Sequence, residues 1–194
     1  MPTTSAIPTR ERIVLASAEL FRRQGYAGTG LKQIVGEAGA PFGSVYHFFP
    51  GGKEQLADEV LRTGGAFFLA LYEAIVPPAE TLNAGIEAFF AGAGLTLEAT
   101  DYADACPIAT VAGEIASTHE TLRVATADVF ESWLDALARD LGTAGAEEPR
   151  ALALSLLALL EGAFLLCRAL RSTEPMRAGA GSALALLPQP KEIR

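Results

Sequence analysis

The sequence of 194 residues has few of the side chains that build catalytic or metal sites. It contains two histidines, two cysteines and one tryptophan. Cys106 and Cys167 have neither the CxxC spacing nor a metal-type spacing, and HExxH, phosphate-loop and nucleophile-elbow motifs are absent. We therefore expect no enzyme activity, no cofactor and no metal, and we expect both thiols to be reduced.

Long uninterrupted hydrophobic runs are also missing. The first twelve residues have no apolar signal core. The longest apolar stretch, residues 151–170, is interrupted by Ser155, Glu161, Gly162 and Arg168, so it falls short of the run of about 18 uncharged residues typical of a bilayer span. We expect a buried helix there, no membrane partner and a cytoplasmic protein.

Positive charge is scarce and unevenly distributed. The formal net charge is −8. Residues 1–62 hold seven Lys or Arg against six Asp or Glu, whereas the remaining residues hold eight against seventeen. Phosphates repel an acidic surface, so any contact with nucleic acid is expected in the N-terminal third, with a few placed cations supplying the affinity.

Helical periodicity runs through nearly the whole chain, and no hairpin signal competes with it. Glycine and proline mark the breaks between about nine predicted helices. These are residues 9–24, about 31–37, 41–49, 53–75, 79–99, 107–117, 120–141, 147–171 and 174–187. We predict an all-α fold with a small domain at residues 1–52 and a larger domain at residues 53–194, connected by the helix 53–75.

Residues 36–49, GEAGAPFGSVYHFF, are the most informative segment. A helix ends on glycine, a tight turn follows, and a short second helix begins near Pro41 with polar and aromatic residues on its free side. This pattern fits a helix-turn-helix, whose second helix can enter the DNA major groove. The sequence therefore predicts a DNA-binding regulator.

Three segments carry a resemblance to a known family. RERIVLASAELFRRQGY, GLKQIVGEAGAPFGSVYHFF and GKEQL, within residues 9–61, resemble the DNA-binding domain of the TetR family of transcriptional repressors. CPIATVAGEIA and LLALLEGAFLLCRALRS are similar to the LmrA/QacR-like branch, which responds to drugs and other small organic molecules. The resemblance implies a C-terminal domain for ligand binding and dimerisation.

The resemblance also implies which side chains contact DNA. Gly43 and Ser44 would lie against bases or backbone, and Tyr46 and His47 would donate to phosphate oxygens. Lys53 would reach a phosphate at a helix N-terminus. Further candidates are Thr29, as a cap and phosphate contact, and Lys32, as a cation. Alternatives stay open for Tyr46 as a packing residue, His47 and Lys53 as surface residues, and Thr29 as a cap alone.

Phe42 departs from the polar or basic residue that relatives of this branch often carry between the proline and the glycine. An exposed aromatic ring there can touch a thymine methyl group in the major groove. It can also fold back onto the domain and contribute no specificity. The sequence leaves both alternatives open.

A single helix-turn-helix contacts only a few base pairs, so such proteins usually bind DNA as dimers on two half-sites. We therefore expect a homodimer. The helices at residues 151–171 and 178–187 are the dimerisation candidates, since their apolar surface is broad for a lone solvated helix. The alternative is that this surface is intramolecular core. The candidate residues are Leu152, Leu156, Leu159, Leu160, Ala163 and Leu166.

A pocket rich in aromatic residues suits an apolar or aromatic ligand. Each candidate has plain core as its alternative, and Glu114 either pairs with a cationic ligand or points to water. The candidates are Phe67, Phe68, Leu71, Tyr72, Phe89, Phe90, Cys106, Ile108, Val111, Glu114, Ile115, Trp133 and Phe164.

These expectations combine into a repressor that binds operator DNA as a homodimer and leaves it when a small apolar or aromatic molecule binds the C-terminal domain. A lipid or small-molecule carrier without DNA binding is the alternative from another class. An activator of the same fold has the same sequence features.

Overall fold

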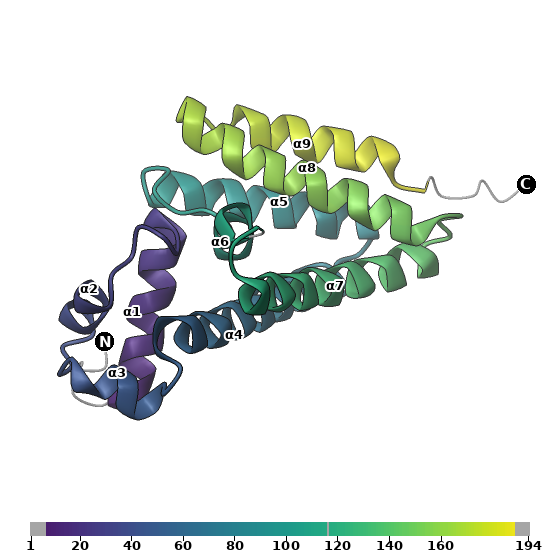
Figure 1. Ribbon diagram of the computed structural model, residues 1–194. Coiled ribbons are helices and arrows are strands. Elements are labelled where there is room, and N and C mark those ends of the chain that lie inside the picture. The colour runs from purple at the N-terminus through teal and green to yellow at the C-terminus, as the bar shows by residue number, and fades with distance from the viewer. Residues whose placement is uncertain (1–6, 116, 189–194) are drawn as a thin grey trace, which may run out of the picture. The chain divides into compact units, whose positions relative to one another are not determined.

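The computed structural model describes residues 7–115 and 117–188. Over these ranges the chain forms nine α-helices and no strand, which confirms the all-α prediction (Figure 1). The predicted ranges match the observed helices to within a few residues. The helices are α1 (Thr9–Gln24), α2 (Leu31–Glu37), α3 (Gly43–Phe48), α4 (Gly52–Ile75), α5 (Leu82–Ala99), α6 (Pro107–Ile115), α7 (Glu120–Thr143), α8 (Pro149–Leu170) and α9 (Glu174–Leu186).

The helices divide into two compact units. The first unit is Met1–Ala66 with Cys106–Val129, and the second is Phe67–Ala105 with Phe130–Arg194. Helices α4 and α7 each begin in the first unit and end in the second. The division predicted after residue 52 instead separates α1–α3 from all later helices.

Helix α1 organises the first unit. Ile13, Leu20 and Phe21 recur at helical spacing and are buried, and α1 packs against α2, α3 and α6. Gly25 ends the helix as predicted, with φ of 76°. Pro8 occupies the N-cap position, Thr9 is the first helical residue, and the Thr9 hydroxyl accepts from Arg12 Nη2 at 3.2 Å.

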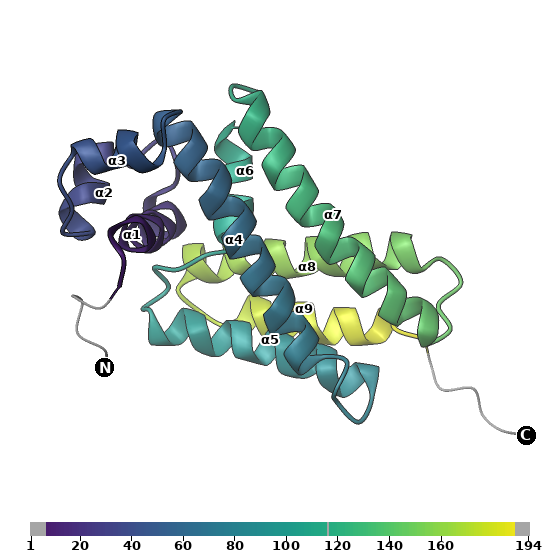
Figure 2. The same ribbon diagram turned by 90° about the horizontal axis from the view of Figure 1, so that it is seen from below.

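Helices α5, α8 and α9 lie wholly in the second unit, together with the C-terminal parts of α4 and α7. Helix α9 lies along both α8 and α5, and the two ribbon views agree on this arrangement (Figures 1 and 2). Close approach requires a small residue, because a Cβ atom at Gly179 would lie 3.3 Å from the Phe90 ring and 3.5 Å from the Ala163 side chain. Pro149 and Pro175 open α8 and α9 at positions where a missing N–H costs nothing.

Helix α8 is, among the residues that the structure describes, the one helix long and apolar enough to cross a bilayer. Its buried side includes Leu156, Leu160 and Phe164 and faces its neighbours in the second unit. Only 33% of its most apolar stretch is buried, so the helix is less buried than the sequence predicts: one side packs into the second unit and the other exposes apolar side chains.

Candidate DNA-binding surface and ligand cavity

Helices α2 and α3 form the predicted helix-turn-helix. Ile34 and Val35 of α2 and Val45 of α3 point into the core of the first unit. The turn between them passes through Gly39, whose φ of 56° lies in the left-handed region that favours glycine. Burial of one face of α3 leaves its other face available to a partner.

The free face of α3 carries the predicted contact residues. Tyr46 and His47 are exposed and Ser44 is half-buried, and a Cβ atom at Gly43 would meet nothing within 4 Å. The His47 ring packs edge-on against Phe48, with centroids 4.7 Å apart. On α2, Lys32 is exposed. Hydroxyl, imidazole and ammonium donors are thus available to phosphate oxygens.

The Lys53 ammonium group bonds within the first unit and does not project freely into solvent. Its Nζ donates to the Tyr26 carbonyl at 2.6 Å and lies 4.0 Å from the centre of the Tyr26 ring. Partial burial lowers the pKa of the Lys53 ammonium, and the negative charge of Glu114 opposes that shift. The cation therefore ties the start of α4 to the loop between α1 and α2.

Thr29 also serves that loop. Its side chain is buried, its hydroxyl donates to the Gly25 carbonyl at 2.7 Å, and the same oxygen accepts from Gln24 Nε2 at 3.2 Å. The predicted cap on α2 is wrong, because Gly30 occupies the N-cap position and no side chain bonds there. The Thr29 hydroxyl stabilises the approach to α2 instead.

Glu114, predicted as a ligand contact, belongs to the first unit and lines no part of the cavity in the second unit. Its Oε2 accepts from the Ala27 backbone N–H at 2.8 Å, across 87 positions of sequence. A Cβ atom at Gly25 would lie 1.7 Å from Glu114 Oε1, so glycine leaves room for the carboxylate. The His119 ring meets the Tyr26 ring edge-on, with centroids 5.2 Å apart. The end of α6 and the start of α7 are thereby fastened to the α1–α2 loop.

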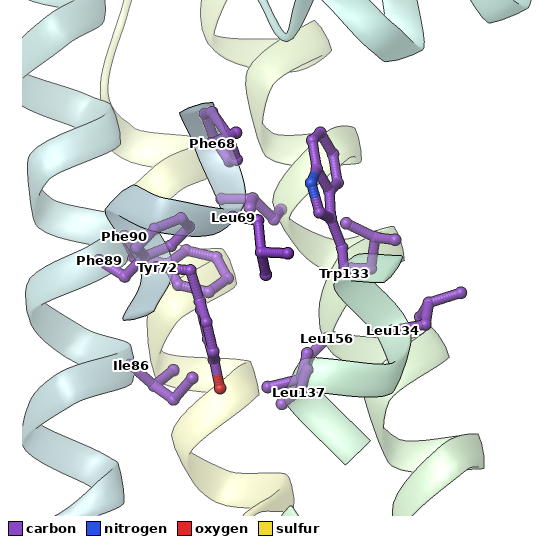
Figure 3. A pocket seen from close by; sticks show the side chains of 12 residues that line it. Phe68, Leu69, Tyr72, Ile86, Phe89, Phe90, Trp133, Leu134, Leu137 and Leu156 are labelled. Carbon is purple, nitrogen blue, oxygen red and sulfur yellow. The ribbon is translucent and has the colours of Figure 1, made fainter. Parts of the chain in front are cut away.

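A cavity with about 530 Å³ of empty space, part of it open to solvent, lies within the second unit (Figure 3). Its walls come from α4, α5, α7 and α8. The lining residues are Phe68, Leu69, Tyr72, Ile86, Phe89, Phe90, Trp133, Leu134, Leu137, Leu156, Leu157 and Leu160.

Part of the predicted ligand set lines this cavity, namely Phe68, Tyr72, Phe89, Phe90 and Trp133. The rings contact one another, because Phe68 lies 5.1 Å from Trp133 and 5.6 Å from Phe89 between ring centroids. This aromatic cluster suits an apolar or aromatic ligand.

The other predicted ligand residues lie elsewhere. Phe67 and Leu71 on α4 are exposed and do not line the cavity, and Phe164 is buried in α8 outside the lining. The remaining residues belong to the first unit, where Glu114 is exposed and the others are buried, namely Cys106, Ile108, Val111, Glu114 and Ile115.

Sequence reasoning missed the aliphatic walls of the cavity. Leu69, Ile86, Leu134 and Leu157 line it, and so do Leu156 and Leu160, for which the sequence predicts dimer contacts. Leucines at helical spacing are the available signal, but that signal is shared by every buried helix.

Tyr72 provides a polar group at one end of the cavity (Figure 3). Its hydroxyl donates to Asp140 Oδ2 at 2.9 Å. Burial raises the pKa of the Tyr72 phenol well above its usual range, and the Asp140 carboxylate raises it further. The phenol therefore stays neutral, and its hydrogen is already used.

The exposed face of α8 differs from the predicted dimer face. Leu156, Leu160 and Ala163 are buried within the second unit, and Leu152 and Leu159 are half-buried. Leu166 is exposed as a dimer contact requires. The other exposed leucines on the two C-terminal helices are Leu154, Leu165, Leu170 and Leu186.

Comparison with known proteins now identifies the class. Residues 13–60 match the family of bacterial regulatory proteins of the TetR type, and residues 83–181 match the C-terminal domain of LmrA/YxaF-like transcriptional regulators. The chain therefore belongs to the TetR family of transcriptional regulators, in the LmrA/YxaF-like group. It is a helix-turn-helix regulator, not an enzyme.

Relatives match over most of their length. The HTH-type transcriptional regulator LmrA of Bacillus subtilis (strain 168) is 36% identical over 174 residues, which cover 87% of this chain and 90% of LmrA. YxaF of the same organism is 35% identical, covering 89% and 92%. A TetR transcriptional regulator from Legionella pneumophila shares the fold, with a TM-score of 0.85 at 22% identity and coverage of 97% and 100%.

Proposed function

We propose that this regulator is a cytoplasmic repressor that binds operator DNA as a homodimer and is released when a small, largely apolar or aromatic molecule binds the second unit. The observation that carries the DNA-binding part is the free face of α3, where Tyr46 and His47 are exposed while Val45 anchors the helix. Lys32, Gly43 and Ser44 complete the proposed contact surface.

In this proposal Lys53 and Thr29 stabilise the fold of the first unit and do not contact DNA themselves. Their polar atoms bond within the first unit, so they position the segments that flank α2 and α3. Loss of either side chain is expected to weaken DNA binding through the fold. Loss of Tyr46 or Lys32 is expected to weaken it through the contacts themselves.

The DNA-binding proposal is tested with duplexes selected by the purified full-length chain from a randomised pool. Lys32→Gln should reduce the salt dependence of binding by about one unit of slope per contact, and Tyr46→Phe should weaken binding about threefold to tenfold across sequences. Arg150→Gln, which removes an exposed cation of the second unit, is the matched control. Absence of any duplex preference at low salt would favour a carrier instead.

The dimer proposal rests on the exposed leucines of α8. Leu165 and Leu166 are 69% and 52% exposed, which is unusual for two adjacent large apolar side chains. We expect Leu165→Glu to give a monomer in sedimentation and to weaken operator binding, since two half-sites need two recognition helices. Leu95→Glu, at a 67% exposed position on α5, should remain dimeric. A dimeric Leu165→Glu variant would contradict this face.

The ligand proposal rests on the apolar cavity, and the chain supplies its own reporter. Trp133 is the sole tryptophan and lines the cavity, so its fluorescence follows occupancy. We expect the uncharged probe N-phenyl-1-naphthylamine to quench Trp133 and to weaken the operator complex. Filling the space with Leu157→Phe should weaken probe binding, whereas Leu95→Phe should not. Unchanged DNA affinity at saturating probe would remove the release step for this ligand class.

The direction of regulation is tested in a reporter strain. A promoter that carries the selected duplex should become more active when the gene for this chain is deleted. Lower activity after deletion would identify an activator with the same contacts.

A further inference from the structure

Phe42 precedes the first residue of α3 and already has helical backbone angles, with φ of −55° and ψ of −40°. Its side chain is 45% exposed. The sequence is compatible with two positions for this ring, in contact with DNA or folded back onto the domain. The structure places the ring outside the core, since the buried aromatic residues of this unit are Phe21, Tyr26 and Phe49.

The Phe42 ring lies next to that of Tyr46 rather than alone. The two centroids are 6.0 Å apart with an interplanar angle of 63°, an edge-on arrangement favoured by aromatic pairs. The Tyr46 ring in turn lies near the backbone at Gly52, where a Cβ atom would be 3.5 Å from a Tyr46 ring carbon. Tyr46 thus limits the positions available to Phe42.

The chemistry of this position restricts what it can recognise. A phenyl ring offers no hydrogen bond to the edges of guanine, adenine or cytosine, and it adds no charge for a phosphate. The apolar group that the major groove presents is the 5-methyl group of thymine. Gly43, which follows directly, has no side chain to hold the helix away from the bases.

We propose that Phe42, supported by Tyr46, reads the 5-methyl group of one thymine in each operator half-site. This inference rests on the proposed DNA binding through α3. Phe42 thus contributes base specificity although its side chain forms no hydrogen bond. The partner of the exposed Phe42–Tyr46 pair is duplex DNA.

The experiment removes the methyl group without changing any hydrogen bond. Duplexes selected by the full-length chain are prepared with deoxyuridine in place of thymidine, one position of each half-site at a time. At one thymine the affinity should fall about threefold to tenfold, in the range of a single apolar contact. Phe42→Ala should bind the thymidine and deoxyuridine forms of that duplex equally.

Two variants separate recognition from folding. Tyr46→Phe keeps the ring and should retain the methyl effect while losing affinity uniformly. Leu15→Ala shortens another exposed apolar side chain, on α1, and should leave the methyl effect unchanged. Circular dichroism and the unfolding temperature of Phe42→Ala should match those of the parent.

The outcomes distinguish this inference from the function on which it rests. Selective binding with no deoxyuridine-sensitive thymine overturns the role of Phe42 and leaves the DNA-binding proposal standing. A methyl effect that persists in Phe42→Ala also overturns it, because another side chain then reads the methyl group. Failure to bind any duplex overturns both.

Discussion

The two compact units use apolar side chains in different ways. In the first unit, Phe21, Ile34 and Phe49 are fully buried, whereas Tyr46 on α3 and Phe42 just before it are exposed. The second unit contains an apolar cavity that is partly open to solvent, and it leaves several leucines of α8 exposed. Amphipathic helices thus build a filled core in the first unit, whereas in the second unit they leave an apolar cavity and exposed leucines.

The largest contrast is expected from removing one aromatic ring in each unit. Phe21→Ala should lower the free energy of unfolding by about 3–5 kcal/mol, because the ring is fully buried in a filled core. Phe68→Ala should cost about 1–2 kcal/mol, because this half-buried ring borders empty space. Urea unfolding followed by circular dichroism and Trp133 fluorescence measures both. Equal losses would contradict the difference between the units.

A second contrast concerns two glycines of the first unit. Gly25→Ala should cost about 1–3 kcal/mol, because φ of 76° with ψ of 177° is a region nearly restricted to glycine and the new Cβ displaces Glu114. Gly36→Ala should instead stabilise by about 0.5–1 kcal/mol, since Gly36 lies within α2 with open space around it. The same urea titration gives the two signs, and a neutral Gly25→Ala would show that the loop is not constrained.

The Tyr72–Asp140 hydrogen bond should make the second unit sensitive to alkaline pH. Tyr72→Phe should cost about 1 kcal/mol at neutral pH. The pKa of Tyr72 is raised by burial and by Asp140, so its contribution is complete below the usual value of 10.0 and is lost as pH rises above it. The decline of unfolding free energy above that pH should therefore be shallower in Tyr72→Phe, as measured by urea unfolding at several pH values.

Asp140→Asn should make the Tyr72 contribution disappear at lower pH, because one cause of the raised pKa is removed. Asp135→Asn, an exposed position on the same helix, is the control. If the parent and Tyr72→Phe decline in parallel, then Tyr72 does not titrate as described.

The smallest effect is expected at the surface of the second unit. Arg150 pairs with Glu131 at 2.5 Å and with Asp135 at 3.4 Å, and all three side chains are substantially exposed. Solvent screening limits such pairs, so Arg150→Gln should change the unfolding free energy by less than about 0.5 kcal/mol. A larger loss of unfolding free energy would contradict the expectation that these exposed ion pairs contribute little to stability.

The predicted sites show where sequence reasoning reaches its limit. Phe67 and Phe68 are neighbours on α4, yet Phe68 lines the cavity and Phe67 is 70% exposed. A step of 100° along a helix separates them, and the phase relative to distant helices is not visible in the local pattern. The helical spacing of Leu156 and Leu160 is likewise compatible with a core position or an interface position. The packing of α8 against α5 and α9 decides between them.

The sequence by itself determined the all-α fold, the approximate ranges of the helices and the position of the helix-turn-helix, because helical periodicity and glycine and proline breaks act over a few residues. Tertiary structure alone decided that Glu114 accepts from Ala27, that Lys53 donates to Tyr26, and which leucines face the cavity. Those contacts join segments far apart in the chain, and their geometry exists only once the helices have packed.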